Sequence, residues 1–312
     1  MLDLLVTGYA SIDYLFRISR SAGVDETAVI ETGSDGEYGG CGLNVAVALA
    51  RLGFKVGAVV ALGDDPAGRD YLAYLATNGV DTRDIVLLPG QKTSRSYIFS
   101  NPQGGNQIYF YPGAAKAWQP PLQIHHLASQ QARACLVTVG DPRYNREFVR
   151  QSILCGLPVF WQMKADIQAY PPEQLSELLS ASRVLFMNLT EARYLMDTRG
   201  VDRIEALQQH PQQVLALTLG SKGSRVFTQD RWCDIPPIPG AELIDPTGAG
   251  DGYTAGFLAA WFKGYSPEIC GRVGAVLASF VIEKTGCQTN LPDWKTLDGR
   301  YTSFFQQTLT TE

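Results

Sequence analysis

The stretch Asp245-Pro-Thr-Gly-Ala-Gly-Asp251 carries the most specific signal in this sequence. Its Asp-Pro start is typical of a turn, and the apolar residues after Asp251 predict a helix. Glycines directly before a helix let backbone N–H groups converge on an anion, and the helix dipole adds positive potential there. The pairing suits phosphoryl transfer: amides of Gly248, Ala249 and Gly250 stabilise the moving charge while Asp251 accepts a hydroxyl proton. An aspartate-capped, glycine-rich helix start is the common alternative, and the other motifs weigh against it.

The composition excludes several classes of protein. A chain of 312 residues with 45% hydrophobic residues can bury a large core, and a net charge of -5 argues against a nucleic-acid or anionic-membrane surface. The six cysteines form no C-x-x-C pair, and the three histidines lack zinc-ligand spacing. The start, Met1–Thr7, is typical of a first strand and not of a signal peptide, and no uncharged stretch is long enough to span a bilayer. We therefore expect a soluble cytoplasmic protein.

Short apolar runs alternate with longer amphipathic segments along most of the chain. This alternation predicts an α/β fold, a doubly wound, mostly parallel sheet covered by helices on both faces. Ligands bind such sheets at the carboxyl ends of the strands. The predicted strands are Leu4–Val6, Lys55–Ala61, Ala134–Val139, Pro158–Trp161, Val184–Met187, Val214–Thr218 and Ser224–Phe227, and predicted helices include Asn44–Leu52, Gly68–Asn78, Pro172–Ser180 and Thr190–Met196.

Two regions, residues 9–38 and 92–112, depart from this rhythm within what we expect to be a single domain of residues 1–312. Their alternating patterns predict β-hairpins, the second with the turn Asn101–Gly105. A sheet this thin should lie over the active site or against a second subunit, as in a homodimer joined through this lid. The predicted lid strands are Ile12–Ile18, Glu26–Glu31, Arg95–Ser100 and Asn106–Tyr111.

The segment Gly39–Gly53 combines glycines with a nearly all-apolar helix. The glycines let a ligand approach the backbone closely. Asn44, the polar residue that opens the helix, either caps it or binds a sugar hydroxyl. A dinucleotide fingerprint fails because Val45 stands where its third glycine would be, and the absence of G-K-[ST] excludes a P-loop.

Two further motifs suit a nucleotide. Asn188 and Glu191 stand three residues apart after a strand, which suits a hydrated Mg²⁺ and phosphates, with a capping box as the alternative. Thr218 and the backbone of Gly220 and Gly223 lie between two strands, where they either contact nucleotide phosphates or form a simple hairpin turn.

Together these residues resemble the PfkB, or ribokinase-like, family of carbohydrate and nucleoside kinases, over essentially the whole chain. The resemblance implies a Rossmann-like domain with a β-sheet lid, and ATP with Mg²⁺ as the phosphate donor. It implies that Asp251 is the base and that Gly248–Gly250 form the anion hole. The acceptor hydroxyls would be held by Asp13, Gly39, Gly40 and Asn44, and the nucleotide and its metal by Asn188, Glu191, Thr218, Gly220 and Gly223.

The resemblance also implies a monovalent cation, K⁺, beside the anion hole. Asp245 and the Thr247 carbonyl match part of that site, and the loop Glu283–Asn290 is expected to supply further carbonyls. The family's Asp-Pro-Asn-x-Arg type sequence is replaced here by Phe160-Trp-Gln-Met-Lys-Ala165. Lys164 either supplies a cation to the phosphates or is a solvated lysine at the strand end.

The sequence does not decide between a small sugar and a nucleoside as the acceptor, and it favours the sugar slightly. The lid aromatic residues either stack on a nucleobase or form the buried face of a lid-mediated dimer; they are Tyr14, Phe16, Tyr97, Phe99, Tyr109 and Tyr111. A sugar would instead need hydrogen-bonding residues, of which Asp13, Asn44, Asn101, Asn106 and Gln107 are available. A kinase for a vitamin-like alcohol fits Gly39–Gly53 less well. A non-catalytic ligand-binding protein would have no need of Asp251.

Overall fold

Strand β1 (Leu4–Thr7) lies inside a ten-stranded sheet of the computed structural model, which describes residues 1–103, 105–166 and 169–309. The strand order is β15-β14-β13-β12-β11-β10-β1-β5-β6, with β7 also paired to β5. All neighbours are parallel except β13–β14 and β14–β15. The other strands are β5 (Val56–Gly63), β6 (Val80–Asp81), β7 (Ile85–Leu88), β10 (Cys135–Val137), β11 (Val159–Gln162), β12 (Ser182–Asn188), β13 (Val214–Thr218), β14 (Ser224–Thr228) and β15 (Arg231–Ile235).

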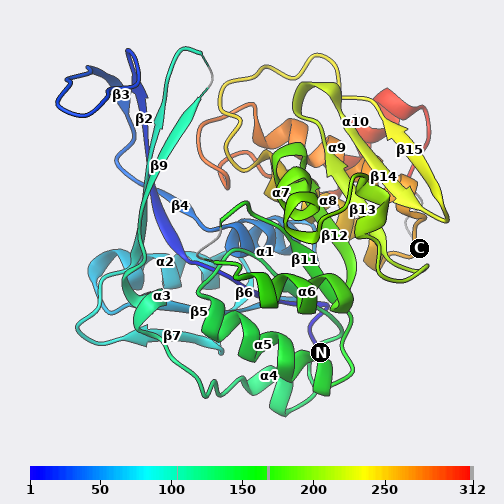
Figure 1. Cartoon of the computed structure of the whole chain (residues 1–312), viewed down its shortest axis with the longest axis horizontal. Coiled ribbons are helices and arrows are strands. Elements are labelled where there is room, and N and C mark those ends of the chain that lie inside the picture. Colours follow the sequence, from blue (N-terminus) through cyan, green and yellow to red (C-terminus); the bar gives the residue numbers. More distant parts are fainter. Residues whose placement is uncertain (104, 167–168, 310–312) are drawn as a thin grey trace.

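Helices cover both faces of this sheet (Figure 1). Because side chains alternate along a strand, Leu4 and Phe160 join one buried apolar cluster while their neighbours Leu5 and Trp161 join the other. The doubly wound fold predicted from the alternation is therefore confirmed. The helices are α1 (Cys41–Arg51), α2 (Pro66–Thr77), α3 (Gly113–Ala117), α4 (His125–Ala128), α5 (Pro142–Leu154), α6 (Pro172–Ala181), α7 (Leu189–Arg199), α8 (Ala249–Phe262), α9 (Pro267–Val281) and α10 (Trp294–Phe305), with 3₁₀ turns at Ile204–Leu207 and Gly220–Lys222.

The second sheet rises above the first as a separate five-stranded lid (Figure 1). Its order is β3-β2-β8-β9, with β4 also paired to β2, and β2 runs parallel to β8. The predicted hairpin is present as β8 and β9; Gly104 of its turn lies outside the described residues. The lid strands are β2 (Ser11–Ile18), β3 (Ile30–Gly33), β4 (Glu37–Gly39), β8 (Ser94–Ser100) and β9 (Asn106–Tyr111).

One predicted lid strand is displaced. The expected strand Glu26–Glu31 is present only at its end: residues 26–29 have no regular structure, and β3 begins at Ile30 and pairs antiparallel with β2. Arg20 explains the difference: its guanidinium pairs with Glu26 and donates to the Thr27 carbonyl oxygen at 3.0 Å. These contacts hold the segment as a loop, so pairing with β2 starts only beyond it.

Within the described residues, no helix is long and apolar enough to cross a membrane. All six cysteines are free.

Candidate active site

A cleft of about 1320 Å³ lies between the lid and the carboxyl ends of the parallel strands. It brings together most of the residues that the sequence singled out, although they come from distant parts of the chain. Those that line it are Asp13, Gly40, Asn44, Lys164, Asn188, Glu191, Thr218, Thr247, Gly248, Gly250 and Asp251. The lining does not include Gly39, Gly220, Gly223, Asp245 or Ala249.

The glycine-rich turn leads directly into α8. Gly248 is the N-cap residue in a left-handed conformation, with φ of 79°, and Asp251 is the third helical residue. The Ala249 amide donates to the Pro246 carbonyl oxygen at 3.2 Å, so it is already engaged in this structure. The first turn of a helix leaves amides without helical partners, and here these include the amides of Gly250 and Asp251. The residues predicted to form the anion hole, Gly248, Ala249 and Gly250, lie at this helix start, and Gly248 and Gly250 line the cleft.

The Asp251 carboxylate is buried, and each of its oxygens accepts from a side-chain amide. Asn44 Nδ2 donates to Oδ2 at 2.6 Å, and Gln162 Nε2 donates to Oδ1. Burial raises the pKa of Asp251 above its ordinary value, while these two bonds and the nearby Lys164 ammonium lower it. The net direction of the pKa is upward, because burial outweighs the hydrogen bonds and the nearby positive charge.

Asn44 does not cap α1. The helix begins at Cys41 with Gly40 as its N-cap, so Asn44 is the fourth helical residue. Its carboxamide spans two polar partners, because its Oδ1 also accepts from Gln288 Nε2 at 2.8 Å. The capping alternative is therefore excluded, and Asn44 belongs to the cleft.

Asp13 lies on β2, lines the cleft and is buried there. Burial raises its pKa, and hydrogen bonds from Ser11 and Ser96 partly offset this. Gly39 lies directly behind it: a Cβ atom at Gly39 would stand 2.0 Å from Asp13 Oδ2. Gly39 thus lets the Asp13 carboxylate reach its position without itself lining the cleft.

Asn188 and Glu191 form the capping box of α7. The backbone N–H of Glu191 donates to Asn188 Oδ1 at 2.9 Å, and the backbone N–H of Asn188 donates to the Glu191 carboxylate at 2.8 Å. Burial raises the pKa of Glu191 to about 7, with the hydrogen bond from Asn188 and the Lys164 charge acting against it. Strand pairing places Asn188 beside Thr218, so both lie at the same end of the cleft. The capping box and a place in the cleft are therefore compatible.

Lys164 follows β11 and stays accessible through the cleft. Its ammonium lies close enough to Asp13, Glu191 and Asp251 to lower the pKa of each. This supports a cation inside the site over a lysine that only faces bulk solvent.

The two remaining loops differ in their relation to the cleft. Gly220 and Gly223 lie in the hairpin turn between β13 and β14, which is the simpler of the two alternatives that the sequence left open. Asp245 joins two loops next to the start of α8: its Oδ1 accepts from the Thr247 backbone amide at 2.9 Å and its Oδ2 from the Gly286 backbone amide at 3.1 Å. Gly286 belongs to the segment 283–290 that was expected beside Asp245.

The lid aromatic residues mostly occupy the face away from the cleft. Tyr14 stacks on Tyr97 with ring centroids 5.3 Å apart, Phe16 stacks on Phe99 at 5.0 Å, and none of the four lines the cleft. These four rings therefore lie outside the cleft in which the stacking hypothesis placed a nucleobase.

Their alternating neighbours face the cleft instead. Ile98, Ile108 and Phe110 line it, and the Phe110 ring lies 4.6 Å from the ring of Tyr9, which follows β1. The lid thus supplies an apolar wall. Of the six aromatic residues singled out in the sequence, Tyr109 alone is part of the cleft lining.

Sequence reasoning missed Gln162, Gln288, Tyr9 and Phe110. Gln162 stands two residues before Lys164, inside the stretch that departs from the family pattern. A polar residue closing an otherwise apolar strand was the available signal. For Phe110 the signal was its place between Tyr109 and Tyr111, which puts it on the other face of β9.

Comparisons with known proteins agree with this geometry. The family model described as pfkB family carbohydrate kinase matches residues 1–294. The chain belongs to the pfkB family. The resemblance to this family seen in the sequence is thereby confirmed, and the protein is an ATP-using phosphotransferase with an alcohol group as acceptor, a sugar or nucleoside kinase.

Three relatives place it within this kinase family. The nucleoside kinase of Methanocaldococcus jannaschii is 33% identical over 303 residues, covering 94% of this chain and 95% of the relative. Its crystal structure superposes with a TM-score of 0.84 over 97% of this chain and 99% of that one. A nucleoside kinase of Methanothermobacter thermautotrophicus is 31% identical, covering 96% of each chain. Arabidopsis thaliana ribokinase, solved with ribose and ATP, is 27% identical with a TM-score of 0.80 over 96% of this chain and 98% of that one.

Proposed function

We propose that this pfkB family kinase phosphorylates a nucleoside. The observation that carries the proposal is the apolar wall of Tyr9, Ile98, Ile108 and Phe110, which continues the cleft beyond the acceptor residues. A sugar alone offers hydroxyls and has little use for such a wall, whereas a nucleobase presents a flat apolar face. The two archaeal nucleoside kinases, at 33% and 31% identity, support the same acceptor. From the sequence alone a sugar was the preferred acceptor and a nucleoside the alternative; the proposal reverses this preference.

The mechanism follows from the arrangement of the side chains. Asp13, Asn44 and the Gly40 backbone hold the hydroxyls of the acceptor sugar. Asp251 orients the reacting hydroxyl and takes its proton as the bond to phosphorus forms. The amides at the start of α8 stabilise the charge of the transferred group, and Lys164 adds a positive charge near it. ATP supplies the γ-phosphoryl group and leaves as ADP.

Two cations belong to the proposal. Glu191 would hold Mg²⁺ through water, with Asn188, Thr218 and the loop of Gly220 and Gly223 toward the nucleotide. The described residues contain no cluster of three or more metal-ligating side chains, which fits an ion bound mainly by phosphates and water. Asp245, the Thr247 carbonyl and the loop 283–290 would hold K⁺, since Asp245 already ties these two loops together.

Initial-rate assays with ATP across nucleosides and free sugars test the proposal. We expect the highest kcat/KM with a nucleoside, and a loss of about 10²- to 10⁴-fold in kcat for Asp251→Asn. Phe110→Ala should raise the KM for the nucleoside, while Phe99→Ala, its control on the opposite face of the lid, should leave it unchanged. A free pentose that outperforms every nucleoside would contradict the assignment of the acceptor.

We also propose a cytoplasmic homodimer joined through the lid. The ring pairs Tyr14–Tyr97 and Phe16–Phe99 and the half-exposed Tyr111 lie on lid residues that do not line the cleft, where a second subunit would cover them. The six free cysteines support a reducing compartment. Sedimentation should show a dimer, and Tyr111→Glu should give monomers; a monomeric parent protein would contradict this part.

A further inference from the structure

Gln162 reaches the proposed base from a different part of the fold. It is the last residue of β11, and its side-chain amide donates to Asp251 of α8, 89 residues further along the chain. Phe160, two residues earlier on the same face, packs on Trp261 and Phe262 near the other end of α8, with ring centroids 5.9 and 6.0 Å away. The buried strand therefore sets Gln162 against the first turn of α8 by rigid packing.

The two amides that hold Asp251 differ in what else they do. Asn44 is the side chain expected to bind the acceptor, so its bond to Asp251 competes with the substrate. Gln162 offers its amide to Oδ1, and its own Oε1 is buried without a hydrogen-bond partner among the described residues. A flipped carboxamide would point that oxygen at the carboxylate, so the donor orientation is the one compatible with an ionised Asp251.

We propose that Gln162 is a positioning residue that holds the Asp251 carboxylate ionised and turned toward the acceptor hydroxyl while Asn44 binds substrate. The inference rests on the proposed role of Asp251 as base. A neutral donor suits this task because it stabilises the carboxylate without adding the full positive charge of a salt bridge, which would weaken the base more strongly.

Two variants test the role. Gln162→Met keeps the length of the side chain and removes the donor. We expect kcat to fall about 10- to 100-fold, the range given by the loss of one hydrogen bond to a charged group, with the acceptor KM within about twofold. The acid limb of the kcat–pH profile should move to higher pH, because the lost bond lowered the pKa of Asp251. Gln162→Glu should move that limb further in the same direction, because a second carboxylate disfavours ionisation.

The control is Gln213→Met. Gln213 is also buried, and its amide donates to the carbonyl oxygens of Leu179 and Ser182 at 2.7 and 2.9 Å, outside the cleft. The Gln213→Met variant should have a lower thermal midpoint than the parent protein and the same kcat–pH profile. If Gln162→Met is too unstable to assay, the Gln162→Glu profile alone decides.

The outcomes separate this inference from the proposal on which it rests. Parent-like kcat and an unmoved acid limb in the Gln162 variants, together with a dead Asp251→Asn enzyme, would overturn the inference alone. Full turnover in Asp251→Asn would overturn the base assignment and the role of Gln162 with it.

Discussion

The side-chain amide of Gln288 donates to the side-chain Oδ1 of Asn44 at 2.8 Å, which joins two segments 244 residues apart in the chain. The same Nε2 atom donates to the Tyr71 hydroxyl at 3.0 Å, and that hydroxyl donates to the Gly39 carbonyl oxygen at 2.8 Å. Because the Asn44 oxygen is engaged by Gln288, the Asn44 amide must point toward Asp251. Gln288 therefore fixes the orientation of a residue that we expect to hold the acceptor.

We predict that Gln288→Leu raises the acceptor KM about tenfold, because Asn44 becomes free to turn its oxygen toward the cleft. The KM for ATP should change little. Steady-state kinetics with each substrate varied in turn give both values, and thermal unfolding checks that the variant is folded. Equal increases in the two KM values would point to a general distortion of the cleft and contradict the prediction.

Gly248 and Gly250 stand two residues apart, and we predict that replacing them by alanine has different effects: the first lowers stability and the second lowers kcat. A Cβ at Gly248 would lie 2.6 Å from Cys287 Sγ and would force a left-handed conformation on alanine, whereas a Cβ at Gly250 meets no atom within 4 Å. Gly248→Ala should therefore lower the free energy of unfolding by about 1–3 kcal/mol. Gly250→Ala should fold like the parent protein but lose at least about tenfold in kcat, because the new methyl group crowds the anion hole.

Chemical denaturation and initial rates, measured side by side on the two variants, separate the effects. A Gly248→Ala protein as stable as the parent would show that the turn can shift away from Cys287. A fully active Gly250→Ala enzyme would show that the Gly250 amide is not part of the anion hole.

Glu191 makes the stability of the protein depend on pH in a predictable direction. Its pKa rises from 4.5 to about 7 on folding, mainly through burial, so the folded state binds its proton more tightly than the unfolded state does. Between these pH values the folded protein retains a proton that the unfolded chain releases, so stability falls as pH rises, by at most about 1.4 kcal/mol per unit.

Glu191→Gln keeps an oxygen acceptor for the Asn188 amide but cannot ionise. We expect it to flatten the fall in stability between pH 5 and 7 and to be more stable than the parent at pH 8. Denaturant unfolding at several pH values measures this slope. Glu147→Gln, which alters a carboxylate paired with Arg150, is the control and should not flatten it. An unchanged slope in Glu191→Gln would assign the pH dependence to other groups.

Much of the fold could be predicted because its signals are local. Every predicted strand of the main sheet is present, since each is a contiguous apolar run, and the lid was found where the strand–helix rhythm breaks. The cleft was predicted in part, because Asn44 and Asp251 each lie in a motif that can be recognised alone. Gln162 and Gln288 could not be found this way: their partners are 89 and 244 residues away, and no spacing encodes such contacts. Alternation separated Phe110 from Tyr109 and Tyr111, but which lid face meets the cleft depends on how the two sheets pack.

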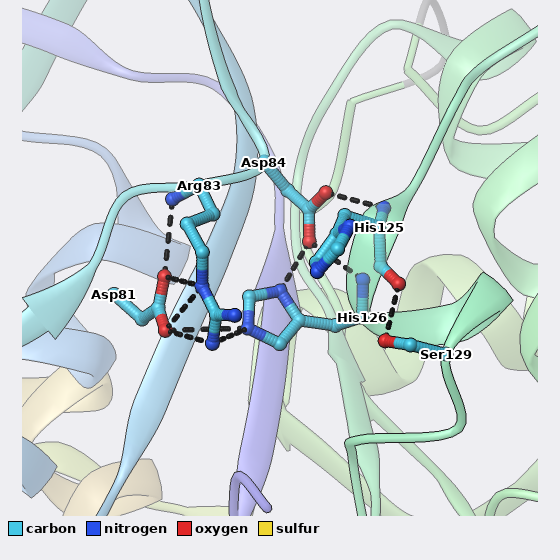
Figure 2. A network of polar contacts seen from close by, with 6 residues as sticks. All are labelled: Asp81, Arg83, Asp84, His125, His126 and Ser129. Carbon is cyan, nitrogen blue, oxygen red and sulfur yellow. Dashed lines mark hydrogen bonds and ion pairs between the residues drawn. The ribbon is translucent and has the colours of Figure 1, made fainter.

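A buried histidine joins the edge of the main sheet to α4, away from the cleft (Figure 2). His126 is fully buried; its Nδ1 contacts Asp84, and its Nε2 lies 2.8 Å from an Arg83 guanidinium nitrogen. The same Nε2 atom also lies 3.2 Å from Asp81 Oδ2, so both members of the Arg83–Asp81 pair contact the ring. Asp84 also accepts from the His125 and His126 amides at 2.5 and 3.2 Å, and Arg83 pairs with Asp81 at 2.7 Å.

We predict that His126→Leu lowers the free energy of unfolding by about 3 kcal/mol, because it leaves the buried Asp84 carboxylate without its ring partner. Turnover should be unchanged, since none of these residues lines the cleft. The neighbouring His125 is exposed, and within the described part of the chain its ring makes only an edge contact with His126, so His125→Ala should change stability by no more than about 0.5 kcal/mol. Denaturant unfolding of the two variants compares the adjacent histidines directly. Similar losses in both would show that the four-residue helix, rather than the His126–Asp84 contact, sets the stability of this edge.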